Sequence, residues 1–314
     1  MKGRNSSRYY RKNSRKKRKL RNILIISAVC LVVLFLLFVI FGNRLNKKVE
    51  ENRGGQTEEQ TTAISPQNAA TYSIAAYPVD VTVGTDVSAQ MKSLYSAGIK
   101  SVSLRLTDSN GKLLIRSDIA MSLGYQSKAD SLGDLSTAIS KAKYYSMFTS
   151  TVFDLQFLSE NDAKQRAVML AYEAALAAEI TEKGADEVIV RAPDADATHT
   201  ELLVDFAESV RSINDSVVLG VALPKEFFYG ESSSEDVAKL VASFDIVGID
   251  VSEVPNEVQD TLGYIESVFA ESNLKYYVLR YNMRVILPSV SDEQNEELTE
   301  VLSENSIQNW QKIS

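Results

Sequence analysis

Carboxylates at the ends of predicted strands are the residues of this 314-residue sequence best suited to chemistry. Asp154 follows the apolar segment 147–153, Asp194 follows the segment 187–192, and Asp250 lies within the segment 245–251. Hydrolysis of a glycosidic bond needs two carboxyl groups about 5 to 10 Å apart, one of them a proton donor. Asp154 and Asp250 form one candidate catalytic pair, and Asp194 is an alternative second acid. For each carboxylate taken alone, a structural or solvated role remains the competing interpretation.

A second set of residues could bind a ligand near these acids. Arg105 and Arg191 lie on predicted strands, and Tyr281 and Asn282 close a segment that we interpret as the seventh strand. Trp310 and Tyr281 offer flat aromatic faces of the kind on which a sugar ring stacks. Packing in the core or at the rim of the fold is the competing interpretation for the aromatic residues.

Several kinds of chemistry are excluded by residue counts. The chain has one cysteine and one histidine, Cys30 and His199, so no intramolecular disulfide and no zinc site of paired cysteines and histidines can form. His199 lies at the start of a predicted helix, where a role at the helix cap is expected. Glycine-rich phosphate-binding loops are absent. The sequence therefore predicts no metal and no cofactor.

Short β-rich segments alternate with amphipathic segments over the C-terminal 240 residues or so, a size typical of an eight-fold βα barrel. The predicted strands are 74–79, 101–106, 147–153, 187–192, 216–223, 245–251 and 274–281. The predicted helices are 87–97, 135–145, 162–182, 200–213, 235–243 and 255–272. An alternating order of this kind favours a parallel sheet covered by helices.

The closed (β/α)8 TIM-like barrel is the preferred fold, and an open doubly wound sheet is the alternative. No Gly-x-Gly-x-x-Gly motif follows the first strand, and seven to eight βα units are more than most open sheets contain. Either 285–287 or 307–313 could supply the eighth strand. The segment Asp108-Ser109-Asn110-Gly111 is interpreted as a turn in which Gly111 provides a positive φ.

The N-terminal residues have the pattern of a membrane signal anchor. An uncharged apolar run begins at Ile23, ends at Phe41 and would span roughly 28 Å as a helix, close to the hydrocarbon thickness of a bilayer. A cleaved signal peptide is the alternative, but its apolar region is usually only about 7 to 15 residues long. Residues 1–22 contain eleven basic side chains and no acid. By the positive-inside rule this tail stays cytoplasmic and the rest of the chain is exported.

The charge of the chain is divided in the same way. The net charge of −7 arises from 34 bases and 41 acids, and removing the eleven N-terminal bases leaves 23 against 41, a net −18. We therefore predict four parts: a basic tail (1–22), a transmembrane anchor (23–42), a flexible linker (43–72) and an extracytoplasmic barrel (73–314). Nucleic-acid binding by the tail is the less favoured alternative to lipid contact.

Five segments of the predicted barrel also carry a family resemblance. They are SVSLRLTDSNGK (101–112), TSTVFD (149–154), the stretch 173–193 with its Arg191-Ala192-Pro193, VVLG (217–220) and FDIVGID (244–250). Their order resembles the bacterial glycoside-hydrolase-like TIM-barrel family, whose members are secreted or membrane-anchored. The resemblance is one of layout and covers most of residues 73–314.

Departures from the family pattern affect the acids. The resemblance implies an Asp and a Lys on the second strand, where this chain has Arg105 and Thr107. The acid expected on the fourth strand either falls on Arg191 or is missing, depending on how the segments are aligned. Arginine in place of an acid reverses the charge that a cationic transition state needs nearby, although Asp154 remains at its matching position.

These observations predict a degenerate, membrane-anchored barrel at the cell envelope that binds a neutral glycan or an envelope protein. The acidic exported part makes nucleic acid an unsuitable partner. An active glycoside hydrolase with a relocated carboxylate pair is the alternative. A barrel mouth lined by Arg105 and Arg191 without such a pair would exclude that alternative. The oligomeric state is not predicted.

Overall fold

The computed structural model describes residues 74–108, 110–126, 132–229 and 233–313. The predicted tail, anchor (residues 23–41) and linker lie outside the described residues. Among the helices that are described, none combines the length and apolar character needed to cross a bilayer.

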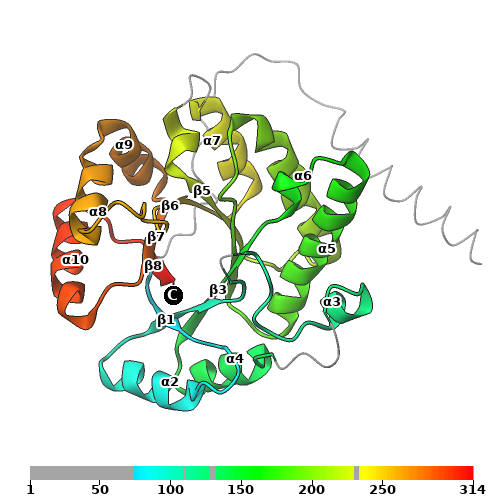
Figure 1. Ribbon diagram of the computed structural model, residues 1–314, viewed down its shortest axis with the longest axis horizontal. Coiled ribbons are helices and arrows are strands. Elements are labelled where there is room, and N and C mark those ends of the chain that lie inside the picture. The colour runs from blue at the N-terminus through cyan, green and yellow to red at the C-terminus, as the bar shows by residue number, and fades with distance from the viewer. Residues whose placement is uncertain (1–73, 109, 127–131, 230–232, 314) are drawn as a thin grey trace, which may run out of the picture. The chain divides into compact units, whose positions relative to one another are not determined.

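Eight parallel strands close into a barrel in the sequence order β1 to β8, and the helices surround it (Figure 1). The strands are β1 (Ala75–Val79), β2 (Ser101–Arg105), β3 (Phe148–Asp154), β4 (Glu187–Arg191), β5 (Leu219–Pro224), β6 (Ile246–Asp250), β7 (Arg284–Pro288) and β8 (Trp310–Ile313). The closed barrel is therefore confirmed, and the open doubly wound sheet is excluded.

The helices follow the order expected of βα units. They are α2 (Val87–Ser96), α3 (Asp118–Ser122), α4 (Leu135–Tyr144), α5 (Ala163–Glu182), α6 (Thr200–Ile213), α7 (Ser233–Ser243), α8 (Thr261–Ala270), α9 (Ser272–Tyr281) and α10 (Asp292–Glu304). Aspartates begin several of them: Asp86, Asp134 and Asp162 each accept backbone N–H groups of the first turn of α2, α4 and α5. Such N-caps satisfy donors that a helix start leaves unpaired.

The predicted seventh strand is wrong, because residues 274–281 form most of α9. Leu274, Tyr277 and Val278 are buried at helical spacing, and Asn282 ends the helix in the left-handed conformation with φ of 48°. The aromatic and β-branched composition favoured a strand, but packing against the barrel decided the structure. Both candidates for the eighth strand are strands, since 285–287 lies in β7 and 310–313 forms β8.

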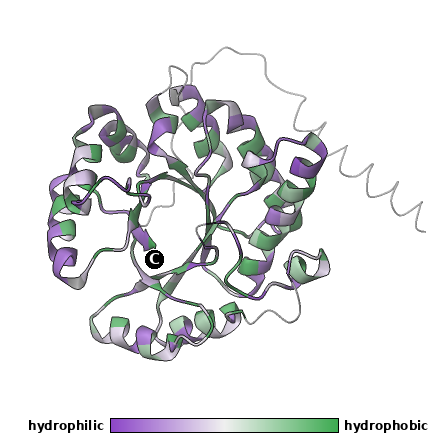
Figure 2. Cartoon of the chain, in the orientation of Figure 1, coloured by the Kyte–Doolittle hydropathy of each residue, from purple (hydrophilic) through white to green (hydrophobic). Residues whose placement is uncertain are grey.

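The barrel encloses an apolar layer between two polar ones. Alternate strand residues face inward, and the middle layer consists of Val152, Ile189, Ala222, Ile246, Ile286 and Ile313. At the N-terminal ends of the strands, the fully buried Arg284 pairs with Glu187. A larger apolar core lies between strands and helices. In Figure 2 both the strands and the helices carry hydrophobic and hydrophilic residues.

Candidate functional site

Four of the charged side chains at the mouth of the barrel belong to the last residues of strands. Arg105, Asp154, Arg191 and Asp250 end β2, β3, β4 and β6. The carboxyl ends of parallel strands meet at one face of a barrel, which is where catalytic residues lie in TIM-barrel enzymes. Asp154 and Arg191 are also direct partners in the register of β3 and β4. The barrel therefore gathers residues that are up to 145 positions apart in the sequence.

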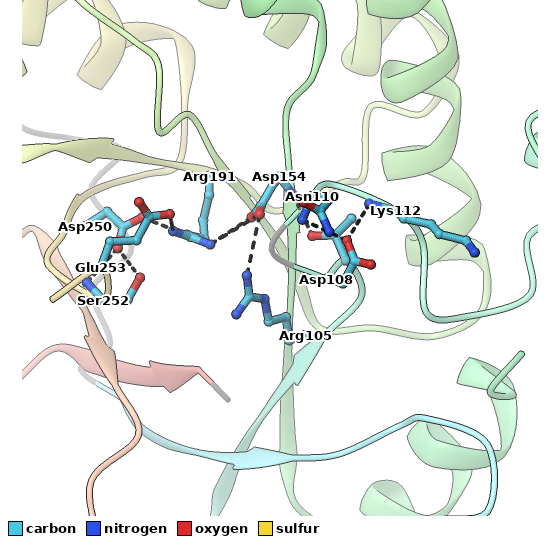
Figure 3. A network of polar contacts seen from close by, with 10 residues as sticks. Arg105, Asp108, Asn110, Lys112, Asp154, Arg191, Asp250, Ser252 and Glu253 are labelled. Carbon is cyan, nitrogen blue, oxygen red and sulfur yellow. Dashed lines mark hydrogen bonds and ion pairs between the residues drawn. The ribbon is translucent and has the colours of Figure 1, made fainter. Parts of the chain in front are cut away.

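Arg191 lies at the centre of this group, between two carboxylates (Figure 3). Its Nε donates to Asp250 Oδ2 at 2.6 Å, and its Nη1 donates to Asp154 Oδ1 at 3.1 Å. Its Nη2 donates to Glu253 Oε1 at 2.8 Å. The Arg191 side chain is 1% exposed, whereas that of Glu253 is 73% exposed. One buried guanidinium thus holds three carboxylates; we call this set of four residues the mouth network.

Each aspartate of the mouth network has a second support. Arg105 Nη2 lies 3.6 Å from Asp154 Oδ2, and the Asp154 N–H donates to the Thr107 hydroxyl at 3.0 Å. Asp250 Oδ1 accepts the Ser252 N–H at 2.9 Å and the Ser252 hydroxyl at 2.6 Å. The two carboxylates are consequently fixed by the protein itself.

Burial and charge act in opposite directions on this network. Burial raises the pKa of Asp154 above its ordinary value, and Arg191 and Arg105 only partly oppose that increase. Burial tends to lower the pKa of Arg191, but Asp250 and Asp154 outweigh it and raise that pKa. Arg191 is therefore permanently charged. The space between Asp154 and Asp250 holds a cation, where a glycosidase would need the anomeric centre of its substrate.

Asp194, the alternative second acid, does not take part in the mouth network. It lies on the loop after β4, is exposed, and forms no hydrogen bond or ion pair with Arg191 or Asp154 within the described residues. His199 lies at the start of α6, as expected, where its Nδ1 accepts the N–H of Asp196. Neither residue reaches the strand ends.

Tyr281, Asn282 and Trp310 lie at the opposite end of the barrel. Tyr281 and Asn282 precede β7, and Trp310 is the first residue of β8, paired in register with Ala75 at the start of β1. Trp310 is 6% exposed and packs edge-on against Tyr77, with ring centroids 5.5 Å apart. The expectation that these residues bind a ligand beside Asp154 is corrected by the true position of β7. Trp310 is therefore a packed residue of the barrel core.

A hollow of about 230 Å³ opens beside Arg191 at the ends of β4, β5 and β6. Its lining includes Asp250 and Glu253 together with Lys225, Glu226 and Tyr264. Lys225 Nζ lies 5.0 Å from the centre of the Tyr264 ring, a cation–π contact that holds the lysine over the aromatic face. Three prolines, Pro193, Pro224 and Pro255, complete a stiff wall.

A separate cavity of about 150 Å³ lies between the ends of β2 and β3 and the helix α5. Asp154 and Glu173 both line it. Burial raises the pKa of Glu173 to about 8, although the N–H groups of Gln156 and Phe157, which donate to its carboxylate, oppose the increase. Sequence reasoning missed Glu173; the only signal was an acid within the alanine-rich segment of α5 that faces the barrel.

A turn that includes Asp108, Asn110 and Gly111 forms as predicted and borders this cavity. Asp108 Oδ1 accepts the N–H groups of Asn110 and Lys112 at 2.8 and 3.0 Å, and Gly111 has a φ of +73°. A Cβ at Gly111 would lie 2.1 Å from Nε2 of the flexible Gln156 side chain, which could move, so the positive φ is the reason that glycine is favoured here. Within the described part of the chain, no cluster of three or more His, Cys, Asp or Glu residues could hold a metal ion.

Comparison with known proteins supports the fold but not a particular activity. The sequence matches no protein-family model and no curated protein. The structure is similar to that of a candidate α-L-fucosidase from Bacteroides thetaiotaomicron, with 10% identity, a TM-score of 0.52, and coverage of 83% of this chain and 90% of that one. An endocellulase from Pyrococcus horikoshii, solved with cellotetraose, gives 10% identity, a TM-score of 0.47, and coverage of 77% and 84%. The likeness to the first of these is one of fold, the closed eight-stranded βα barrel.

Proposed function

We propose that this barrel is a non-catalytic binding domain of the cell envelope that recognises a neutral glycan or an envelope protein. The observation that carries the proposal is the position of Arg191. Its guanidinium is buried between Asp154 and Asp250, the two carboxylates best placed for hydrolysis.

The mouth network opposes glycoside hydrolysis in two ways. A glycosidase needs one carboxyl as a proton donor and a second as a nucleophile or base, with the sugar between them. Here both carboxylates share a cation, so neither is free to attack, and Arg191 fills the space between them. A positive charge at that position also disfavours the oxocarbenium-like transition state.

The hollow beside Arg191 supports a binding role. It is about 230 Å³ in volume and combines the Tyr264 ring with charged groups from Lys225 and Glu226. An aromatic face with nearby hydrogen-bonding groups is the usual composition of a small ligand site. Strongly anionic partners are disfavoured, because 41 acids against 23 bases follow residue 22.

Membrane attachment is part of the proposal and is supported by the sequence. The apolar run 23–41 and the eleven bases before it would place the barrel outside the cell, with the bilayer as the first partner. Protease treatment of intact protoplasts tests this arrangement. We expect degradation of the barrel while an epitope at the N-terminus stays protected; protection of both would contradict it.

Binding is tested by co-sedimentation of the full chain, in detergent, with insoluble neutral polysaccharides and with purified envelope fractions. We expect retention that falls at least tenfold in Tyr264→Ala, because the ring forms the aromatic wall of the hollow. Tyr144→Ala is the matched control, since Tyr144 is an 80% exposed tyrosine on α4. Equal retention of the two variants would argue against the hollow as the binding site.

One observation favours the alternative of an active hydrolase. Asp154 and Glu173 line one cavity, and a buried acid with a pKa of about 8 is a suitable proton donor. Against it, Glu173 Oε1 accepts the Gln156 N–H at 2.7 Å, and Asp154 is held by Arg191 and Arg105. A glycan-cleaving activity lost in both Asp154→Asn and Glu173→Gln would establish this alternative.

A further inference from the structure

The cavity beside α5 is separate from the hollow at Arg191 and has its own chemistry. It holds about 150 Å³, and its walls include Tyr125, Gln156, Met169, Tyr172, Glu173 and Leu176. At about 15 Å³ of such space for each water-sized group, the cavity accommodates about ten groups. That is close to the size of one six-membered sugar ring with its substituents.

Glu173 is a buried carboxyl group without a cationic partner. The residue is 2% exposed, and within the described residues no lysine or arginine forms an ion pair with it. Its carboxylate accepts only the N–H groups of Gln156, at 2.7 Å, and Phe157, at 3.4 Å. A buried carboxylate is costly unless a positive charge accompanies it. The raised pKa of Glu173, about 8, is the consequence.

Tyr172 presents a second unsatisfied group to the cavity. It is 8% exposed, and its hydroxyl forms no hydrogen bond with any residue that the structure describes. Its ring packs on Tyr125, with centroids 4.3 Å apart. Burial accordingly raises the pKa of the Tyr172 hydroxyl, as do the charges of Glu173 and Glu179. The cavity thus offers an aromatic wall and a free hydroxyl beside an uncompensated carboxyl.

We propose that this cavity binds an amino-sugar unit, with the ammonium against Glu173 and the ring against the Tyr125–Tyr172 pair. The inference rests on the proposed binding function but departs from a wholly neutral glycan, because the unit bound in this cavity carries a free amine. The ammonium supplies the missing cation, and the aromatic pair offers a flat apolar face to the sugar ring. The Tyr172 hydroxyl and the Gln156 amide are available for the sugar hydroxyls.

The other charged groups around Glu173 do not replace this ammonium. Asp154 on β3 lines the same cavity, but Arg191 and Arg105 already compensate it. Lys112, on the loop after β2, also lines this cavity, but its side chain is exposed and forms no ion pair with Glu173 among the described residues. Glu179, farther along α5, accepts from Ser117 Oγ at 2.6 Å and pairs with Lys183 at 3.1 Å. Glu173 is therefore the carboxylate that an incoming cation would neutralise.

The test is isothermal titration calorimetry of the full chain in detergent with glucosamine, and with glucose as the neutral analogue. At pH 7 we expect glucosamine to bind at least tenfold more tightly than glucose. Since Glu173 is largely protonated at pH 7, binding of the ammonium should release about one proton to the buffer. Titrations in two buffers of different ionisation enthalpy measure this release, and glucose should release none.

Three variants locate the effect. Glu173→Gln should remove both the preference for glucosamine and the proton release. Tyr172→Phe leaves the carboxylate and its N–H contacts in place and should weaken both sugars severalfold, so the proposal stays testable if Glu173→Gln fails to fold. Glu182→Gln, an exposed acid on the same helix, is the matched control and should bind as the unaltered chain does.

Equal affinity for glucosamine and glucose, or tighter binding without proton release, would overturn the amino-sugar proposal. Retention of the preference in a folded Glu173→Gln variant would overturn it as well. None of these results would restore catalysis to the mouth network, so the proposed non-catalytic function would stand. Conversely, glycan cleavage that depends on Asp154 would refute that function, whatever the calorimetry shows.

Discussion

Two buried arginines at opposite ends of one barrel have different surroundings. At the base, Arg284 and Glu187 are both fully buried and form an ion pair, while Asn309 Oδ1 accepts from Arg284 Nε at 2.9 Å. At the mouth, Arg191 is shared by three carboxylates, of which Glu253 is mostly exposed. At the base, one carboxylate is paired with one guanidinium. At the mouth, three carboxylates surround the guanidinium of Arg191.

The difference separates an ion pair enclosed within the barrel from a network of ion pairs at the carboxyl ends of the strands. The base pair joins the first residues of β4 and β7 across the barrel interior, where no substrate could reach it. The mouth network lies where barrel enzymes place catalytic groups, and its acids neutralise an arginine instead. A buried ion pair is by itself weak evidence for stability. Removing one partner leaves the other charge buried and unpaired, so the resulting loss of stability measures how much each end of the barrel depends on its ion pairs. The following variants test that contrast.

The largest effect is expected at the base. Glu187→Gln removes the charge that compensates Arg284, whose Nη2 already lacks a hydrogen-bond partner within the described residues. We expect a loss of about 3 to 5 kcal/mol in the free energy of unfolding, measured by urea denaturation. The double variant Glu187→Leu with Arg284→Met should recover most of it. A loss below about 1 kcal/mol would show that the base is hydrated.

Arg191→Met should have a smaller effect that depends on pH. It leaves Asp154 and Asp250 without their shared cation, although Arg105 and Ser252 still support them. We expect a loss of about 2 to 4 kcal/mol at pH 7. Without Arg191, the pKa of Asp154, which burial already raises, would rise further, so protonation at pH 5 should reduce the loss. Denaturation at the two pH values measures this, and an equal loss at both would contradict the account.

Glu173 adds a third case, a buried carboxyl without any arginine. Its pKa of about 8 in the folded chain exceeds the ordinary value of 4.5. Protonation therefore stabilises the folded state, and this contribution, present below about pH 4.5, is lost as pH rises toward 8. At about 1.4 kcal/mol for each pKa unit, the loss is on the order of several kcal/mol.

Comparison of unfolding free energies across this pH range isolates the Glu173 contribution. We expect the unaltered chain to lose stability relative to Glu173→Gln as pH rises. Glu182→Gln should follow the unaltered chain throughout. Parallel pH profiles for the unaltered chain and Glu173→Gln would mean that Glu173 is ionised in the folded state at all these pH values.

The smallest effect is expected for Glu253→Ala. Its carboxylate contacts Arg191 at 2.8 Å, but the side chain is 73% exposed. Exposed ion pairs contribute about 0 to 1 kcal/mol because water and salt screen them. Thermal unfolding should therefore shift by a few degrees at most. A loss of stability comparable to that of Arg191→Met would contradict this, because Glu253 would then contribute as much to stability as the two aspartates.

Local pattern predicted most of the barrel, and long-range packing decided the rest. The strands from 75–79 to 246–250 and the helices α2 and α4 to α7 match the alternation of apolar and amphipathic segments. Residues 274–281 were misread because Tyr276, Tyr277 and Val278 suit a strand by composition, while their burial follows a helical period. Because of that error, Tyr281 and Asn282 were predicted at the carboxyl ends of the strands, whereas they lie before the start of β7.

The site was predictable only in part for a similar reason. Asp154, Arg105 and Arg191 were recognised from their positions at strand ends. The pairing of Arg191 with Asp250, 59 residues later, depends on closure of the barrel and on side-chain direction, which no local pattern contains. Glu173 was missed because its significance comes from what surrounds it: a cavity, two backbone N–H groups and no cation.

Hydrolysis is the most direct test of the claim that the mouth network is non-catalytic. The purified full chain, in detergent, is incubated with a panel of envelope polysaccharides and neutral glucans, and newly formed reducing ends are measured. We expect a rate no higher than that of a variant carrying both Asp154→Asn and Asp250→Asn. Turnover by the unaltered chain that either single substitution abolishes would contradict it.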